Sequence, residues 1–499
     1  MLRRQPQNDY QPVTRSGPRL SETGHSPVDL WPVKPKGGSG KGQRPLEPQE
    51  STAKLSSKSS DQNNFSATFL KYGHAFSYAA LFLFTLILYA RPAEFYPSRL
   101  TASIALLVGI ATLGFFIPTQ LSLEGTLTAR PREVNLVLLF CLTGLLSIPL
   151  AINPQEAWAE FSGTFIRCIV IFIVMINVVR TEARLKGLLF LAMAAGIWLS
   201  VEAINDYRLG LMTIEGYRAA GRGTGIFGNT NDMALHLVTI LPISVAFLFG
   251  SKGMARKLLY GACAAVIIAA IVLSYSRGAF IGMLVALLFI AWKLGRSRRL
   301  EIVFAVLSCA GFIVLLAPDK YGSRLLSIFI PSLDPEGSAD ARRGELFRSI
   351  YVALRHPLLG IGMGNYQPEM SYRGLVTHNS YTQVAAEMGM SALACYTMFI
   401  VTPLRKLAQI ARETFEMRRD SRFYYLTLGL QASLIAYLVS SIFLSVAYVW
   451  YVYYLVGYAV CLTRMYESET GKAVVPETRK DRKKAEAPLI SESSTVVMT

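Results

Sequence analysis

Residues 257–294 read KLLYGACAAVIIAAIVLSYSRGAFIGMLVALLFIAWKL, two apolar runs separated by the turn Tyr275-Ser276-Arg277-Gly278. A helix of about 20 apolar residues is long enough to cross the roughly 30 Å hydrocarbon core of a membrane. The runs 257–274 and 278–294 therefore predict two membrane helices joined by a short polar turn.

The same pattern recurs along most of the chain. With 52% hydrophobic and only 17% charged residues, the chain is more apolar than a soluble protein of 499 residues needs to be. Further apolar runs bring the number of expected spans to about twelve; they lie near 73–90, 100–117, 134–151, 163–179, 185–204, 231–250, 300–317, 384–404, 423–443 and 446–463. The sequence thus predicts an all-α polytopic membrane protein.

Basic residues set the expected orientation, because Lys and Arg are retained on the cytoplasmic side in short loops. One set of alternate loops is rich in them: Arg130, Arg132, Arg180, Arg184, Lys186, Lys252, Arg256, Lys257, Lys293, Arg296, Arg298, Arg299, Arg405, Lys406, Arg412, Arg418, Arg419 and Arg422. Both termini are then cytoplasmic, and segments 152–162, 205–230 and 319–383 face outward. We interpret the net charge of +17 as this topological signal and not as nucleic-acid binding.

The expected organisation has five parts. Residues 1–70 are rich in Pro, Gly, Ser, Gln and Lys without apolar periodicity, which predicts a disordered cytoplasmic tail. Residues 71–318 hold spans one to nine, 319–383 form one long outer loop, and 384–463 hold the last three spans. Residues 464–499 form a basic cytoplasmic tail, whose cluster around Arg479 either is solvated or touches anionic lipid.

The long loop carries the best candidate for proton chemistry, His378, in the run His378-Asn379-Ser380-Tyr381. Apolar residues at helical spacing over 341–355 predict an amphipathic helix on or near the outer membrane surface. The glycine-spaced stretch from Pro357 to Tyr366 is too irregular for a helix, but its backbone can approach a ligand or a helix end closely. All six cysteines lie in expected spans and no His, Asp and Glu cluster has metal-ligand spacing, so we expect chemistry without a metal.

Two arginine-bearing segments accompany this loop on the expected outer side. One contains Arg218, Arg222 and Asn231 with several glycines, and Asn229 or Asn231 is suited to cap the helix that follows. The other is the turn that contains Arg277. Guanidinium groups bind phosphate oxygens in a bidentate manner and stay charged at any relevant pH, so Arg222 and Arg277 are suited to hold a diphosphate.

Several motifs together resemble the O-antigen ligase and polysaccharide polymerase superfamily. They are Gly221-Arg222-Gly-Thr-Gly225-Ile-Phe-Gly228-Asn-Thr-Asn231-Asp232, Ser276-Arg277-Gly278, Arg343 with Phe347, Pro357-Leu-Leu-Gly360-Ile-Gly362, and His378-Asn379-Ser380-Tyr381 with Glu387 and Gly389. The resemblance covers roughly residues 72–463. It departs from the family pattern at Thr230, where Pro is common, and at Phe347, where Trp is common.

The resemblance implies a GT-C-like membrane glycosyltransferase fold in the bacterial inner membrane, with a periplasmic loop over a cavity for an undecaprenyl-diphosphate-linked glycan. His378 would be the general base toward an acceptor hydroxyl, and Arg222 and Arg277 would stabilise the leaving diphosphate, with inversion and without a cofactor. The acceptor would be a lipid A core sugar or a growing glycan. The residues with supporting or substrate-binding roles would be Arg343, Asn379, Tyr381, Asn231, Arg218 and Glu387.

Other interpretations of the same residues remain open at this point. The two arginines also suit interfacial anchors for lipid headgroups, Glu387 suits a local pair or helix cap, and Tyr381 suits packing. A twelve-helix secondary transporter is the competing functional class, although no repeat at the half-way point supports it. A non-catalytic partner of a polysaccharide export machine would need neither His378 nor the arginines.

Overall fold

The computed structural model describes residues 73–211, 217–220, 226–295, 299–316, 320–326, 330, 338–418 and 421–474. The chain divides into the units Met1–Gly73 and His74–Thr499, and every helix discussed here belongs to the second. The predicted N-terminal tail 1–70 and the end of the predicted C-terminal tail, from 475 on, lie outside the described residues, as does Arg222.

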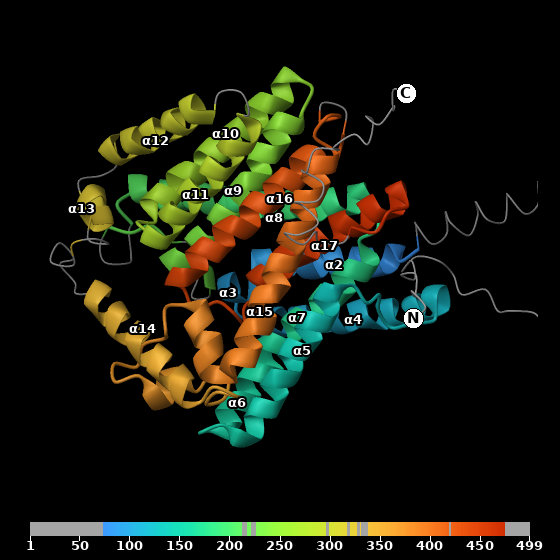
Figure 1. The fold of residues 1–499 in the computed structure, drawn as a ribbon, viewed down its shortest axis with the longest axis vertical. Coiled ribbons are helices and arrows are strands. Elements are labelled where there is room, and N and C mark those ends of the chain that lie inside the picture. The colour runs from blue at the N-terminus through green and yellow to red at the C-terminus, as the bar shows by residue number, and fades with distance from the viewer. Residues whose placement is uncertain are drawn as a thin grey trace, which may run out of the picture. The chain divides into compact units, whose positions relative to one another are not determined.

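Helices build all of the described regular structure. They are α2 (Ala75–Ala90), α3 (Pro92–Phe95), α4 (Arg99–Glu124), α5 (Arg132–Ser147), α6 (Pro154–Glu160), α7 (Ile166–Val178), α8 (Glu182–Arg208), α9 (Thr230–Gly250), α10 (Met254–Leu273), α11 (Arg277–Leu294), α12 (Arg299–Leu316), α13 (Lys320–Leu326), α14 (Ser338–Arg355), α15 (Ser380–Glu413), α16 (Tyr424–Ser440) and α17 (Trp450–Thr470). Short turns η3 (Ile226–Gly228), η5 (Tyr366–Met370) and η6 (Ser441–Phe443) lie between them (Figure 1).

The all-α polytopic membrane fold predicted from the sequence is confirmed. Ten helices of the described part are long and apolar enough to cross a membrane. The two remaining expected spans, 300–317 and 446–463, correspond to α12 and α17, which form helices without being among those ten. In α17 the reason is composition, because tyrosines and the charged residues Arg464 and Glu467 replace much of the aliphatic content.

Two predicted boundaries need correction, and both involve charged residues inside helices. Helix α17 continues to Thr470, so the first residues of the predicted tail 464–499 are helical, with Arg464 buried and donating to the Ile176 carbonyl at 2.7 Å. Helix α15 begins at Ser380 and reaches Glu413, beyond both ends of the expected run 384–404. Residues 380–383, assigned to the outer loop, therefore form the first turn of a span.

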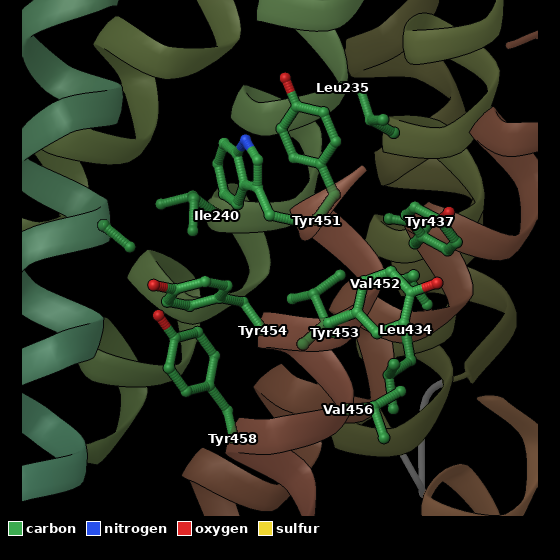
Figure 2. Close-up of a cluster of buried hydrophobic side chains, with 14 of the residues drawn as sticks. Leu235, Ile240, Leu434, Tyr437, Tyr451, Val452, Tyr453, Tyr454, Val456 and Tyr458 are labelled. Atoms are coloured by element: carbon green, nitrogen blue, oxygen red, sulfur yellow. The ribbon is translucent and has the colours of Figure 1, made fainter. Parts of the chain in front are cut away.

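The core of the bundle is built around α17, which is buried nearly all round, as a central helix must be. It packs against α7, α15 and α16, and α9 packs against α16. Figure 2 shows Tyr451, Tyr453, Tyr454 and Tyr458 of α17 with Leu434 and Tyr437 of α16. Two of the buried hydroxyls have clear partners: Tyr454 lies 3.0 Å from the Thr85 hydroxyl, and Tyr437 lies 2.8 Å from Tyr396.

One buried ion pair fastens the far end of α15, opposite the end where α15 begins. Lys406 Nζ lies 3.0 Å from Glu133 Oε2 at the start of α5, and the Glu133 side chain is fully buried. A buried charge is tolerated only while its partner neutralises it. This pair therefore fixes α15 against α5.

We expect Lys406→Met to destabilise the protein strongly, because it leaves the Glu133 carboxylate buried without its counter-charge. The loss should be about 3–5 kcal/mol, and the double variant Glu133→Gln with Lys406→Met should recover much of it. Thermal unfolding of the purified protein in detergent measures the effect. The matched control is Arg405→Met, which removes an exposed cation one residue away. Equal melting temperatures for Lys406→Met and the control would contradict the prediction.

Candidate functional site

The polar turn between α10 and α11 places Arg277 at the first position of α11. Ser274 accepts a bond from the Ser276 main chain at 3.2 Å, and Tyr275 adopts a left-handed backbone with φ of 53°. The Arg277 side chain is mostly buried, with the residue 8% exposed. A cation at a helix N-terminus adds its charge to that of the free N–H groups there, so this turn is suited to an anionic ligand.

The segment before α9 lies against this turn. Ala219 donates its N–H to the Leu273 carbonyl at 3.0 Å, and Arg218 Nε donates to the Ser274 carbonyl at 3.0 Å. Arg218 also donates to Asn231 Oδ1 at 2.9 Å. Arg218 and Asn231 thus hold the turn to the first turn of α9, and their predicted contacts with substrate stay a prediction.

The first turn of α9 has the cap that the sequence allowed at either of two asparagines. The Asn229 side chain accepts the main-chain N–H of Asn231 at 2.9 Å, so Asn229 is the cap. The described segment before it ends at Ala220 and resumes at Ile226. The placement of Arg222, which lies between, therefore stays a prediction.

His378 lies immediately before α15, in a strained backbone position with φ of 52°. The Asn379 side chain caps α15 by accepting the N–H groups of Tyr381 and Thr382 at 2.9 and 3.0 Å. Asn379, predicted to bind substrate, therefore orients the residue before it. Burial, together with the positive charge of Arg342, lowers the pKa of His378 from 6.5 to about 4, so the imidazole is neutral at physiological pH.

The connection between α16 and α17 joins the arginine turn to the histidine segment. Ser440 donates to the Gly278 carbonyl at 3.2 Å, beside Arg277, and Ser445 lies 2.7 Å from the Thr377 hydroxyl, beside His378. Ser380 donates to the Leu444 carbonyl at 2.7 Å. A Cβ at Gly278 would approach Phe443 to 2.8 Å, so only glycine fits there. Two of the three predicted catalytic residues, Arg277 and His378, therefore flank residues 440–446, although about a hundred positions separate them in sequence.

Tyr381 and Glu387, both in α15, make hydrogen bonds that hold neighbouring segments together. The Tyr381 hydroxyl donates to the Leu438 carbonyl at 2.9 Å and accepts from Ser441 at 3.2 Å, which fastens α15 to α16. Glu387 is 3% exposed, and its Oε1 accepts the N–H of Tyr366 at 3.2 Å. These positions support the packing and local-pair interpretations of both residues over direct contact with substrate.

The glycine-spaced stretch of the loop hydrogen-bonds to a break in α15. Gly389 interrupts the helix with φ of 87°. The freed main chain pairs with the loop: Ile361 and Gly362 donate to the Ala386 and Glu387 carbonyls at 3.0 and 2.9 Å, and Met390 donates to the Pro357 carbonyl at 2.8 Å. The expectation that these glycines let the backbone approach a helix closely is therefore confirmed.

Helix α14 lies beside the first part of α15, as Figure 1 shows, and begins at Ser338, earlier than the predicted 341. Its inner face carries Ser349, which donates to Thr382 at 2.9 Å, and Glu345, which accepts from the Tyr366 hydroxyl at 2.8 Å. The apolar residues that defined the predicted amphipathic helix face away, with Phe347 60% and Leu354 73% exposed. Its contact with the membrane surface stays a prediction.

The arginines of α14 differ in their surroundings. Arg343, which the resemblance singled out, is exposed, with its guanidinium 5.8 Å from the centre of the Phe347 ring. Arg342 is half-buried and is the residue whose charge acts on His378. Sequence reasoning missed Arg342, although it stands one turn before Glu345 and two before Ser349, on the face that turns inward. It also missed Ser440 and Ser445, which no sequence pattern marks.

Among the residues that the structure describes, no three His, Cys, Asp or Glu side chains are grouped so that they could hold a metal ion. The polar groups gathered at this end of the bundle include the Arg277 guanidinium and the His378 imidazole. Such a set binds anions and moves protons.

Comparison with known proteins gives a match to a protein family. The profile of a family described as O-Antigen ligase matches residues 262–397, which run from α10 to the part of α15 beyond Gly389. Arg277, the outer loop and His378 all fall inside the match, whereas Arg218 and Asn231 precede it. A search of curated proteins found no match to the chain.

We expect Gly389→Ala to disrupt the pairing between the loop and α15. A Cβ at this position would lie 2.2 Å from the Leu358 carbonyl oxygen, and this backbone conformation, with φ of 87° and ψ of 175°, costs a non-glycine residue about 1–3 kcal/mol before any clash. The measurement is the yield and melting temperature of monodisperse protein in detergent. The control Gly114→Ala lies in α4 with no atom within 4 Å of the new methyl group and should be neutral or slightly stabilising. Wild-type stability of Gly389→Ala would show that the break in α15 is not needed.

Proposed function

We propose that this protein transfers an undecaprenyl-diphosphate-linked glycan to an acceptor hydroxyl at the periplasmic face of the inner membrane. The proposal starts from the match of residues 262–397 to the profile of the O-antigen ligase family. The match itself supports glycan transfer of the ligase or polymerase type. One observation carries the more detailed proposal: residues 440–446 bond to the neighbours of both Arg277 and His378. The α16–α17 connection thus contacts the segments that carry the cation, Arg277, and the proposed base, His378.

In the proposed reaction the acceptor oxygen attacks the anomeric carbon from the face opposite the diphosphate. The new carbon–oxygen bond forms as the bond to the diphosphate oxygen breaks, so the sugar carbon is inverted. His378 takes the hydroxyl proton, and the bonding electrons leave with the diphosphate. Arg277, with Arg222, stabilises the negative charge that develops there, which is the role that Lewis-acidic metals have in other glycosyl transfers.

A base whose pKa lies near 4 is weak, and this fits the order of bond changes. A sugar hydroxyl is far too poor an acid to lose its proton first. Its acidity rises only when its oxygen begins to bond to an electron-poor anomeric carbon, so departure of the diphosphate must lead and proton transfer must follow. Most of the barrier is then lowered at the diphosphate, by the arginines.

The proposed orientation follows from the Lys and Arg distribution. The helix ends where α9, α11, α15 and α17 begin carry the candidate site, and the basic connections lie at the opposite ends of these helices. The site is then periplasmic and both termini are cytoplasmic. A ligase and a polymerase would share this donor site and differ in the acceptor, a lipid A core sugar or a growing lipid-linked glycan.

We expect His378→Ala and Arg277→Ala each to reduce transfer by on the order of 10²- to 10⁴-fold. The assay supplies purified protein with a lipid-linked oligosaccharide and, in separate reactions, a lipid A core acceptor and a second lipid-linked glycan. The acceptor that becomes extended distinguishes ligase from polymerase. His356→Ala and Arg355→Ala are matched controls, because both side chains are exposed in the same loop. Wild-type rates in both site variants would show the mechanism to be wrong.

We expect kcat/KM to stay constant from about pH 8 to about pH 5 and to fall as the pH approaches about 4, because the base must be neutral and its pKa is lowered to that value. Arg342→Gln removes one cause of the lowering, so the fall should move to higher pH. The value of kcat should begin to fall at a higher pH than kcat/KM does, because the negative charge of a bound diphosphate stabilises the imidazolium form of His378.

The control for this pH profile is Arg343→Gln, which removes an equal charge from the exposed neighbour. It should leave the acid limb where the wild type has it. Superimposable profiles for Arg342→Gln and the wild type would contradict the assigned electrostatic effect.

A further inference from the structure

Three of the four described non-glycine residues with positive φ lie at the end of the bundle that carries the candidate site, whereas His74 precedes α2 at the opposite end. Four described residues other than glycine have positive φ: His74, Arg91, Tyr275 and His378. Tyr275 and His378 belong to the site. Such conformations persist only where the surrounding structure enforces them, and they concentrate at ligand-binding positions. Arg91, with φ of 44°, has no part in the proposed mechanism and is the residue to explain.

Arg91 stands between α2 and α3, at the same end of the bundle as the site. Tyr89, two residues before it, packs against His236 of α9 and Trp450 of α17, with ring centres 5.2 and 5.3 Å apart. Pro92 follows Arg91 and disfavours helical backbone at the residue before it. The chain thus ends α2 and turns at a position where an arginine is conformationally costly.

The Arg91 side chain lies on the segment that carries the other arginine motif. Its guanidinium carbon is 5.5 Å from the centre of the Phe227 ring, and Phe227 belongs to the run Gly221–Asp232 that contains Arg222. Phe227 is 3% exposed and also contacts the His236 and Trp450 rings. An aromatic face fixes the guanidinium plane and removes water from one side of it.

Glu94, one turn later in α3, pairs with Arg91 Nη1. Both side chains are largely buried, at 17% and 19% exposed. The charge of Arg91 also acts on Asp232 in the first turn of α9. A carboxylate is a weaker partner for a guanidinium than a diphosphate, which offers more charge and more acceptor oxygens. Glu94 and Asp232 therefore orient the Arg91 guanidinium, and a diphosphate can still compete with them for it.

We propose that Arg91 is a further donor-binding residue, which contacts the diphosphate of the lipid-linked glycan together with Arg277. This inference rests on the proposed function and extends it, because it adds a third arginine from the first span of the bundle. The Phe227 ring orients the guanidinium, and Glu94 holds it until the donor replaces that carboxylate.

The test measures binding of undecaprenyl diphosphate to the full-length protein in nanodiscs of zwitterionic lipid, before any transfer assay. Arg91→Ala should weaken binding by on the order of tenfold to a hundredfold, the effect of losing one charged hydrogen-bonding group. The donor affinity of Arg91→Lys should lie between those of the wild type and Arg91→Ala, because a lysine keeps the charge but cannot form the two parallel hydrogen bonds of a guanidinium. In transfer assays the donor KM should rise while the acceptor KM stays unchanged.

Two further variants separate donor binding from a structural role. Arg99→Ala removes an exposed arginine from the first position of α4, eight residues after Arg91, and should bind donor like the wild type. Glu94→Gln breaks the resting ion pair but keeps the arginine, so donor binding should be retained or tightened. If Glu94→Gln loses donor affinity as Arg91→Ala does, the ion pair is structural and the proposal is wrong.

Three other results would also overturn the proposal. Wild-type donor affinity in Arg91→Ala would place Arg91 outside the site, and a rise in acceptor KM alone would place it on the acceptor. A loss of binding that appears only when anionic lipid is added would place it on a lipid headgroup. Failure of the wild type to glycosylate any acceptor would reject the proposed function instead. The binding comparison would still decide the role of Arg91.

Discussion

The constraint on which this architecture depends is that a helix inside a membrane protein cannot leave its main-chain groups unpaired. Helix α15 is broken at Gly389, and the carbonyls of Ala386 and Glu387 are satisfied by loop N–H groups from Ile361 and Gly362. A polar loop and an apolar span are therefore one hydrogen-bonded unit. His378 owes its position to this unit, because it precedes the first residue of the same helix.

The site is assembled from segments that are distant in sequence and meet at one end of the bundle. The α16–α17 connection bonds to both the Arg277 turn and the His378 segment, while Arg218 bonds the Arg277 turn to α9. The hydroxyls and amides between these elements are mostly structural. This leaves the charged and titratable groups, Arg277, His378 and Arg91, as those that chemistry would use.

Much of the fold followed from hydropathy, and the rest depended on contacts that no local pattern encodes. Apolar runs located the spans because crossing a membrane requires length and apolarity alone. They misplaced both ends of α15. The helix begins before the apolar run because Asn379 caps it, and it continues beyond the run because the charge of Lys406 is neutralised by Glu133. Motif spacing predicted Arg277 and His378 as site residues, and their roles stay a prediction. It also assigned Arg218 and Glu387 to substrate, since a side chain that holds the protein together looks the same in sequence as one that holds a ligand.

The hydrogen bonds between the loop and α15 have a thermodynamic consequence for the residues they fix. Asn365 is also bound, through its side chain, to the main chain of Asn153, so the stretch from Pro357 to Asn365 is held from two sides. A segment already ordered in the free protein loses little conformational entropy when substrate arrives. The cost of organising this part of the site is met during folding, once for each molecule, and not again in each catalytic cycle.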